Sequence, residues 1–251
     1  MISFKKVMPY KPIGRNLLVV DKKQKGNFST YEKFMESVSY IIPRRGGLPD
    51  KIVEGEEVNV PFFTLAVEIE AKTKKELKQK KLEAINSIKK LEDTEIFKSL
   101  EFAVRQTQTV KQSGDLTLAS LNYACSVIES RELSLGNVIV HPQQLANLRF
   151  YRSDTCIIFG KLKKWWYGYN GKLWGMKIRV SNRVTPGSVF ILSSPEYVGV
   201  LSEKKIKFSK IDYTDFTYKQ TISKEIGVCI INDYSIAKID LIPFEISKKA
   251  K

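Results

Sequence analysis

Alternation of apolar and polar residues predicts strands in several parts of this chain, most clearly from residue 63. The sequence FTLAVEIEAK puts Leu65, Val67 and Ile69 on one side of an extended backbone, with Glu68 and Glu70 on the other side. Because successive side chains of a strand point to opposite faces, this segment is expected to bury one face and to expose the other.

A helical period replaces this alternation in residues 73–105. Apolar residues recur there at mostly helical spacings, and neither proline nor glycine occurs before Gly114. These features predict the longest helix of the chain, with a break near residues 92–94. Its first turns are rich in lysine, which is typical of a solvated helix face and equally of a surface that lines a cavity holding nucleic acid.

The second half of the chain predicts a compact α/β lobe. The segments LTLASLNYACSVIES, NVIVHP and PQQLANLRF indicate a helix, a strand and a helix that has proline in its first turn. Strands follow, with a hairpin turn at Asn170-Gly171, a turn at Pro186-Gly187 and a strand over EYVGVLS. Residues 205–241 add more strands, which we expect to pack with the long helix, so that the lobe is an insertion between them.

The N-terminal part predicts a basic arm and then a projecting loop. Prolines and glycines interrupt the first thirty residues, and residues 16–20 form a short apolar anchor. A short helix is expected over residues 29–37, where a serine or threonine can cap it. Residues 40–64 then predict a two-stranded excursion that has almost nothing of its own to bury and therefore needs a neighbour.

Composition indicates a globular protein of one large or two small domains. The chain has 251 residues, of which 43% are hydrophobic. Its three cysteines are far apart, so neither a disulfide framework nor a paired-cysteine zinc site is indicated, and a reducing, cytoplasmic setting fits. Neither a signal segment nor an apolar run of membrane-spanning length is seen, so no membrane partner is expected.

The net charge of +15 makes nucleic acid a candidate partner. Lysine and arginine attract polyanions because their binding releases counterions from phosphates. A lysine-rich composition that serves solubility alone explains the charge equally well.

Catalytic and metal-binding patterns are not found in the sequence. His141 is the only histidine and follows a buried-looking strand, so a structural role is favoured. Cys125 lies on the apolar side of its helix and is expected to be a packed thiol rather than a reactive one. Glu54, Glu56 and Glu57 lack nitrogen or sulfur partners and indicate a solvated loop. We therefore expect no cofactor, no metal and no enzymatic activity.

One basic and aromatic cluster has the composition of a binding surface. It combines several lysines with four aromatic residues, Trp165, Trp166, Tyr167 and Tyr169. Such clusters stack on single-stranded bases. Aromatic residues are also enriched at protein interfaces, and we favour contact with a neighbouring subunit.

Taken in order, these segments resemble the major capsid proteins of tailed double-stranded DNA viruses that share the HK97 fold, a fold also used by encapsulins. The resemblance covers nearly the whole chain. It is carried by IIPRRGG and KIVEGEEVNVP in the excursion, KKLEAINSIKKLEDTEIFKSLEFA in the long helix, SLNYACSVIE and NVIVHPQQLANLR in the lobe, and LWGMKIRVSNRVTPGSVFILSSPEYVGVL and KEIGVCIINDYSIAKIDL near the end.

The resemblance implies an α+β fold with an N-terminal arm, an extended two-stranded loop, a peripheral domain with a long spine helix, and an inserted axial α/β domain. The implied boundaries are residues 1–30 for the arm, 31–63 for the loop region, 64–114 and 203–246 for the peripheral domain, 115–202 for the axial domain and 247–251 for a basic tail.

It also implies roles for named residues. The loop residues expected to make contacts between subunits, as ion pairs that are weak singly but repeated over a shell, are Arg44, Arg45, Lys51, Glu54, Glu56 and Glu57. The arm residues expected to face DNA or the interior of the shell are Lys5, Lys6, Lys11, Arg15, Lys22, Lys23 and Lys25. The residues expected at contacts of the axial domain are Trp165, Trp166, Tyr167 and Tyr169.

The implied function is structural. Hexamers and pentamers of the chain would assemble into an icosahedral shell around double-stranded DNA bound without sequence specificity, a virion capsid built in the host cytoplasm. The chain leaves no room for an N-terminal scaffolding domain, so a portal and separate scaffold or decoration proteins are expected partners. Lys51 alone does not establish a covalent cross-link, and non-covalent assembly is expected.

Two alternatives stay open at this stage. An encapsulin-type compartment of the same fold would hold a protein cargo instead of a genome. A non-assembling basic protein would bind nucleic acid tightly and in a salt-sensitive way as a monomer or dimer.

Overall fold

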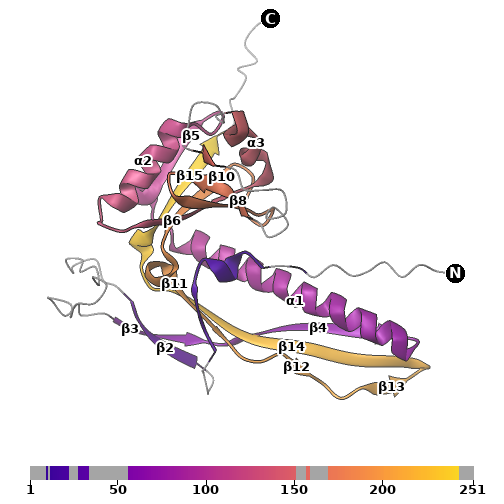
Figure 1. The fold of residues 1–251 in the computed structure, drawn as a ribbon. Coiled ribbons are helices and arrows are strands. Elements are labelled where there is room, and N and C mark those ends of the chain that lie inside the picture. Colours follow the sequence, from indigo (N-terminus) through magenta and orange to yellow (C-terminus); the bar gives the residue numbers. More distant parts are fainter. Residues whose placement is uncertain are drawn as a thin grey trace, which may run out of the picture.

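The computed structural model describes residues 10, 12–22, 28–33, 56–150, 157–158 and 169–242. In this part the chain forms a six-stranded sheet, a seven-stranded sheet and a two-stranded ribbon. Figure 1 shows the long helix lying along the first sheet, with the second sheet and its helices gathered at one end of it. We refer to the long helix with the six-stranded sheet as the helix–sheet layer, and to the rest of the globular body as the lobe.

The six-stranded sheet is built around one long strand. Its members are β1 (Val19–Asp21), β4 (Phe63–Ala71), β11 (Gly199–Glu203), β12 (Lys207–Phe208), β13 (Asp212–Thr214) and β14 (Thr217–Ile230). Strand β4 pairs antiparallel with β14 over its whole length. Leu65 and Ile69 are buried, whereas Glu68 and Glu70 are exposed, so the predicted strand with one solvated face is confirmed.

Helix α1 (Lys74–Ala103) confirms the predicted long helix. Thr73 caps it, because its hydroxyl accepts a hydrogen bond of 3.1 Å from the backbone N–H of Glu76. The predicted break near residues 92–94 is wrong. Glu92 and Asp93 are fully buried and bind partners from other segments, so they do not end the helix. Among the described helices, none has the length and apolarity needed to cross a bilayer.

The lobe contains the seven-stranded sheet. Its members are β5 (Thr109–Ser113), β6 (Leu135–Val140), β7 (Ile157–Ile158), β8 (Tyr169–Leu173), β9 (Met176–Val180), β10 (Ser188–Ser193) and β15 (Ile236–Ile242). Helices α2 (Leu118–Glu129) and α3 (Pro142–Phe150) confirm the two predicted helices around a strand. Short helix α5 (Pro195–Val198) replaces the first half of the strand expected over EYVGVLS, because Pro195 suits the first turn of a helix.

The closing strands divide between the two sheets. Strand β14 packs on α1 as expected, but β15 pairs with β10 and β5 in the lobe. The prediction that all closing strands pack with the long helix is therefore wrong for β15. Its apolar residues Ala237 and Ile239 are buried beneath α2 and complete the core of the lobe.

One of the two predicted turns is confirmed and one is wrong. Gly187 has a φ of 89°, and the Ser188 N–H donates to the Thr185 carbonyl at 2.9 Å, which closes the expected turn. The other hairpin turns at Trp174-Gly175, with φ values of 47° and 85°, instead of at Asn170-Gly171. Gly171 lies within β8 at a shift of register, so the Asn-Gly pair marks a bulge.

The predicted helix over residues 29–37 is wrong where the structure describes it. Residues Phe28–Lys33 form β2, which pairs antiparallel with β3 (Glu56–Pro61). The run FSTYEK is rich in aromatic and β-branched residues, and the ladder to β3 outweighs the capping signal at Ser29 or Thr30.

Two short 3-10 turns, η2 (Gln106–Gln108) and η3 (Asp233–Ser235), join other elements.

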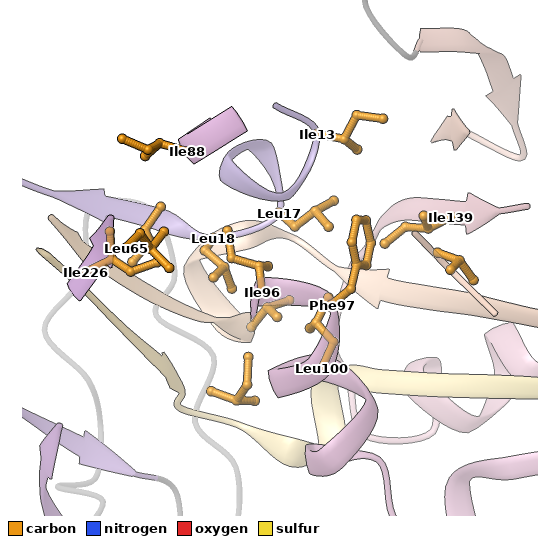
Figure 2. Close-up of a cluster of buried hydrophobic side chains, with 14 of the residues drawn as sticks. Ile13, Leu17, Leu18, Leu65, Ile88, Ile96, Phe97, Leu100, Ile139 and Ile226 are labelled. Atoms are coloured by element: carbon orange, nitrogen blue, oxygen red, sulfur yellow. The ribbon is translucent and has the colours of Figure 1, made fainter. Parts of the chain in front are cut away.

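A single apolar cluster connects the helix–sheet layer to the lobe. Phe190 and Leu192 of β10 face this cluster, while Val189 and Ile191 face the second cluster under α2. Figure 2 shows Leu17 and Leu18 of the N-terminal segment beside residues of α1, with lobe residue Ile139 at the edge of the cluster. The N-terminal anchor predicted at residues 16–20 is thus confirmed, because both leucines are buried.

Candidate assembly surfaces

The β2–β3 ribbon projects from the body of the subunit (Figure 1). Among the described strands, β2 and β3 pair with each other alone, from Phe28 opposite Pro61 to Lys33 opposite Glu56, and the ribbon contacts β14 at its base. Val60 at this base is buried. A two-stranded ribbon has marginal stability by itself, so this one gains most from a neighbouring molecule.

Most of the residues predicted to contact other subunits lie outside the described residues. This holds for the loop residues Arg44, Arg45, Lys51 and Glu54, the arm residues Lys5, Lys6, Lys11, Lys23 and Lys25, and the aromatic residues Trp165, Trp166 and Tyr167. Glu56 and Glu57 begin β3, opposite Lys33 and Glu32. Tyr169 begins β8. Lys22 is exposed at the end of the anchored N-terminal segment.

Arg15, which was predicted to face DNA or a shell interior, forms ion pairs within the subunit. Its guanidinium binds Glu203, and its Nε lies 3.3 Å from Oε1 of Glu92. Lys224 of β14 binds the same two carboxylates, with 2.6 Å between its Nζ and Oε2 of Glu203. Four charges from the N-terminal segment, α1, β11 and β14 therefore meet inside the helix–sheet layer. These ion pairs hold Arg15 against the body of the subunit, and its expected place toward DNA or a shell interior stays a prediction.

The electrostatics of this cluster favour the ionised form of Glu203. Burial raises the pKa of Glu203, but hydrogen bonds and charge from Lys224 and Arg15 outweigh burial and leave the pKa below its ordinary value. Glu92 is fully buried, so removing one cation would leave a charge in a poorly solvated place. The cluster thus ties the N-terminal segment to three other elements.

The neighbouring carboxylate, Asp93, holds the backbone of the same N-terminal segment. Its Oδ2 accepts hydrogen bonds from the Ile13 N–H at 2.9 Å and the Tyr10 hydroxyl at 2.6 Å, and its Oδ1 accepts one from the Gly14 N–H at 2.8 Å. Gly14 permits this approach, because a Cβ there would lie 3.0 Å from Oδ1 of Asp93. Burial raises the pKa of Asp93 in spite of these bonds.

Sequence reasoning missed this anchoring site. The available signal was the pair Glu92-Asp93 at positions that the helical period assigns to the buried side of α1. Two adjacent acids inside an apolar pattern indicate buried partners as well as a possible helix break. The partners are distant in the sequence, so their identity needed the fold.

The far end of the six-stranded sheet presents apolar side chains to solvent. This tip, which we define as residues 207–218, carries the exposed residues Phe208, Ile211, Tyr213 and Phe216. Phe216 is 86% exposed, and both it and Asp215 have positive φ in the turn between β13 and β14. Contiguous exposed apolar residues of this kind mark interaction surfaces.

A groove of about 660 Å³ lies between the end of α1, the base of the ribbon and β14. Its lining is largely apolar, and Phe102 at the end of α1 is 94% exposed. Lys98, Arg105 and Asp233 supply its charged groups. The groove and the tip lie at opposite ends of the helix–sheet layer, so they are separate candidate surfaces.

Cys125 and His141, the two residues considered for chemistry, are packed or hydrogen-bonded within the lobe. Cys125 is buried with its sulfur 4.0 Å from that of Met176, and burial raises its pKa to about 12, which confirms a packed thiol. Nδ1 of His141 accepts a hydrogen bond from the Gln143 N–H at 3.3 Å. Within the described residues, no group of three His, Cys, Asp or Glu side chains is arranged to hold a metal ion.

The sequence matches no protein-family model and no curated protein. Solved structures do match the fold. The capsid of cyanophage P-SCSP1u superposes with a TM-score of 0.64 at 12% identity, over 97% of this chain and 92% of that chain. The SrpI encapsulin of Synechococcus elongatus PCC 7942 gives 0.63 at 14% identity, over 89% and 85%. A virus-like particle from Pyrococcus furiosus gives 0.56 at 15% identity, over 90% and 92%.

Proposed function

We propose that this chain, which has the HK97 fold shared by those capsid and encapsulin subunits, is the major structural protein of a closed icosahedral shell that encloses double-stranded DNA. The observation that carries the proposal is the near-complete coverage of both chains in the match to the cyanophage capsid. A chain whose fold matches this one over nearly its whole length forms a capsid there.

Surface properties of the subunit support assembly. Among the described elements, no second layer covers the ribbon, and the tip exposes four large apolar side chains. Surfaces of this kind are exposed to water in a monomer, and contact with neighbouring subunits in a shell would bury them. A shell built from hexamers and pentamers repeats each of these contacts many times, so weak contacts suffice.

We assign the helix–sheet layer to the peripheral domain and the lobe to the axial domain of such a subunit. Compared with the boundaries expected from the sequence, this assignment moves β5 and β15 to the axial domain and β11 to the peripheral domain, following their sheet pairing. In this assignment the ribbon is the described part of the extended loop. Ion pairs between neighbouring copies are proposed for Arg44, Arg45, Lys51, Glu54, Glu56 and Glu57. Contacts around the axial domain are proposed for the aromatic cluster at Trp165, Trp166, Tyr167 and Tyr169.

Two arginines of the loop allow a direct test of the proposed ion pairs. The double variant Arg44→Glu and Arg45→Glu is expected to fold like the wild type and to assemble poorly. Reversal of Glu54, Glu56 and Glu57 to lysine in the same chain is expected to restore particles, since copies exchange these contacts. Assembly that is unchanged by the arginine reversal would remove these residues from the interface.

The viral assignment implies further partners and a location. The proposed partners are DNA bound without sequence specificity, a portal, and separate scaffold or decoration proteins. The proposed location is the virion, after assembly in the host cytoplasm. Nuclease treatment of purified particles, followed by measurement of protected DNA length, tests the assignment. DNA of uniform genome length supports it, and particles without nucleic acid contradict it.

A second candidate is a compartment that holds protein cargo. The match to the SrpI encapsulin, at a TM-score similar to that of the phage capsid, favours this candidate specifically. Mass spectrometry of particles purified from the native source separates the two. A stoichiometric co-purifying enzyme without protected DNA would establish the compartment.

A further inference from the structure

A line of lysines runs along one side of α1. Lys74, Lys78, Lys81 and Lys89 are separated by four, three and eight residues, which places them on one side of a helix. At 1.5 Å per residue the line is about 22 Å long. We call these four residues the lysine stripe. It lies about a quarter turn from the side on which Leu77, Ala84 and Ile88 are buried against the sheet.

The lysine stripe has no acidic partner among the described residues. Lys74 and Lys78 are exposed, and Lys81 and Lys89 are half-buried with no ion pair to a carboxylate. Three lysines on the opposite face of the sheet are paired with carboxylates. Lys219 binds Glu70 at 3.1 Å, and Lys204 and Lys207 both bind Glu225. The lysine stripe lacks the acidic partners that these three lysines have.

Like charges spaced four and three residues apart repel one another along a helix. Each such pair destabilises an isolated helix. A polyanion laid along the stripe replaces this repulsion with attraction. The lysine stripe is thus a place where an external chain of negative charges is attracted.

The N-terminal segment joins α1 on an adjacent side. The Tyr10 N–H donates to Oδ1 of Asn86 at 3.0 Å, and Lys90 Nζ lies 5.9 Å from the centre of the Tyr10 ring. Tyr10 therefore contacts α1 on the side next to the lysine stripe.

We propose that the lysine stripe binds the phosphate backbone of double-stranded DNA, so that the α1 face of the subunit is turned toward the packaged genome. This inference rests on the proposed shell function. The stripe contains no aromatic residue, and the residues between its lysines include the apolar Leu82 and Ile85, so it has no platform for stacking on unpaired bases. Its length matches roughly six phosphates of one strand at 3.4 Å each.

The test compares two variants of the full chain that lose equal charge. The stripe variant carries Lys74→Gln, Lys78→Gln, Lys81→Gln and Lys89→Gln. The control variant carries Lys111→Gln, Lys172→Gln, Lys177→Gln and Lys210→Gln, all exposed and away from α1. Fluorescence anisotropy with a 30-base-pair duplex, at a series of salt concentrations, gives the affinity and its salt dependence for each unassembled protein.

The stripe variant is expected to bind the duplex at least tenfold more weakly at low salt. Its slope of log affinity against log salt should fall by about 2–4, because each phosphate contact contributes about 0.9. The control variant should keep most of both values. Equal losses in the two variants, or no loss in either, would overturn the proposal.

Two further measurements keep the outcome decisive. A variant with arginine at all four stripe positions should bind like the wild type, and if the glutamine variant does not fold, the pair Lys78→Gln and Lys89→Gln takes its place. Particle formation is scored separately by electron microscopy. If the stripe variant forms particles and binds the duplex like the wild type, only the proposal for the lysine stripe is contradicted. Wild-type protein that never forms particles would contradict the proposed function.

Discussion

The hydroxyl of Tyr10 donates a hydrogen bond of 2.6 Å to Oδ2 of Asp93, a buried carboxylate in the middle of α1. Asp93 also accepts from two backbone N–H groups of the N-terminal segment. Through these bonds, a segment with little regular structure is held in one place on the long helix.

Replacement of Asp93 by alanine is expected to release this segment. Three hydrogen bonds to a charged group are lost, and a loss of about 3 kcal/mol in the free energy of unfolding is expected. Hydrogen exchange of the amides of Ile13 and Gly14 should become at least tenfold faster. Protection that is unchanged in the variant would show that the segment is held by its leucines alone.

The pH dependence of this site has a definite sign. Burial raises the pKa of Asp93 in the folded chain, so the folded state binds the proton more tightly than the unfolded state does. The contribution of Asp93 to stability therefore decreases as pH rises from about the ordinary value of 3.8 through the raised pKa. Tyr10→Phe removes a bond that favours the carboxylate and should raise the pKa further. Carbon NMR titration of Asp93 measures both values.

Lys224 is the cation whose loss is expected to cost most. Lys224→Met leaves the buried Glu92 and Glu203 with Arg15 alone, and a decrease of about 3–5 kcal/mol in the free energy of unfolding is expected. The matched control is Lys219→Met, which breaks an exposed pair with Glu70 and should cost no more than about 1 kcal/mol. Urea denaturation that gives the two variants equal stability would contradict the account of the cluster.

Glu225 should titrate at unusually low pH. Hydrogen bonds from Lys204 and Lys207 lower its pKa from 4.5 to about 2. Since the folded pKa is the lower one, the stabilising effect is present above the ordinary pKa and is lost as pH falls toward 2. In the double variant Lys204→Met and Lys207→Met, NMR titration should show the midpoint back near 4.5. A midpoint that stays low would exclude these lysines as its cause.

The tip offers a test that separates folding from assembly. Phe216 is exposed and has a φ of 59°, a conformation that asparagine adopts more readily than phenylalanine. Phe216→Asn should therefore raise the free energy of unfolding by up to about 1 kcal/mol while it reduces particle yield. Tyr123→Asn, on the exposed side of α2, is the control and should assemble normally. Normal assembly of the Phe216 variant would remove the tip from the set of contacts.

Local sequence patterns predicted the elements whose structure depends mainly on their own residues. The alternation of Leu65, Val67 and Ile69, the period of α1 and the Pro186-Gly187 turn are examples. The ribbon strand β2 was mistaken for a helix because its structure comes from pairing with β3, about thirty residues away. The roles of Arg15 and Asp93 depend on contacts between distant parts of the chain, which no local pattern contains. Gly14 and Asp93 are 79 residues apart in the sequence, and Arg15 and Glu203 are 188 residues apart.

Electron microscopy of the purified protein, combined with sedimentation, shows whether this chain builds a closed shell, first alone and then with scaffold and portal proteins supplied. Closed icosahedral particles of uniform size, with this chain as the main component, are expected. Protein that remains monomeric or dimeric in every one of these conditions would overturn the proposed function.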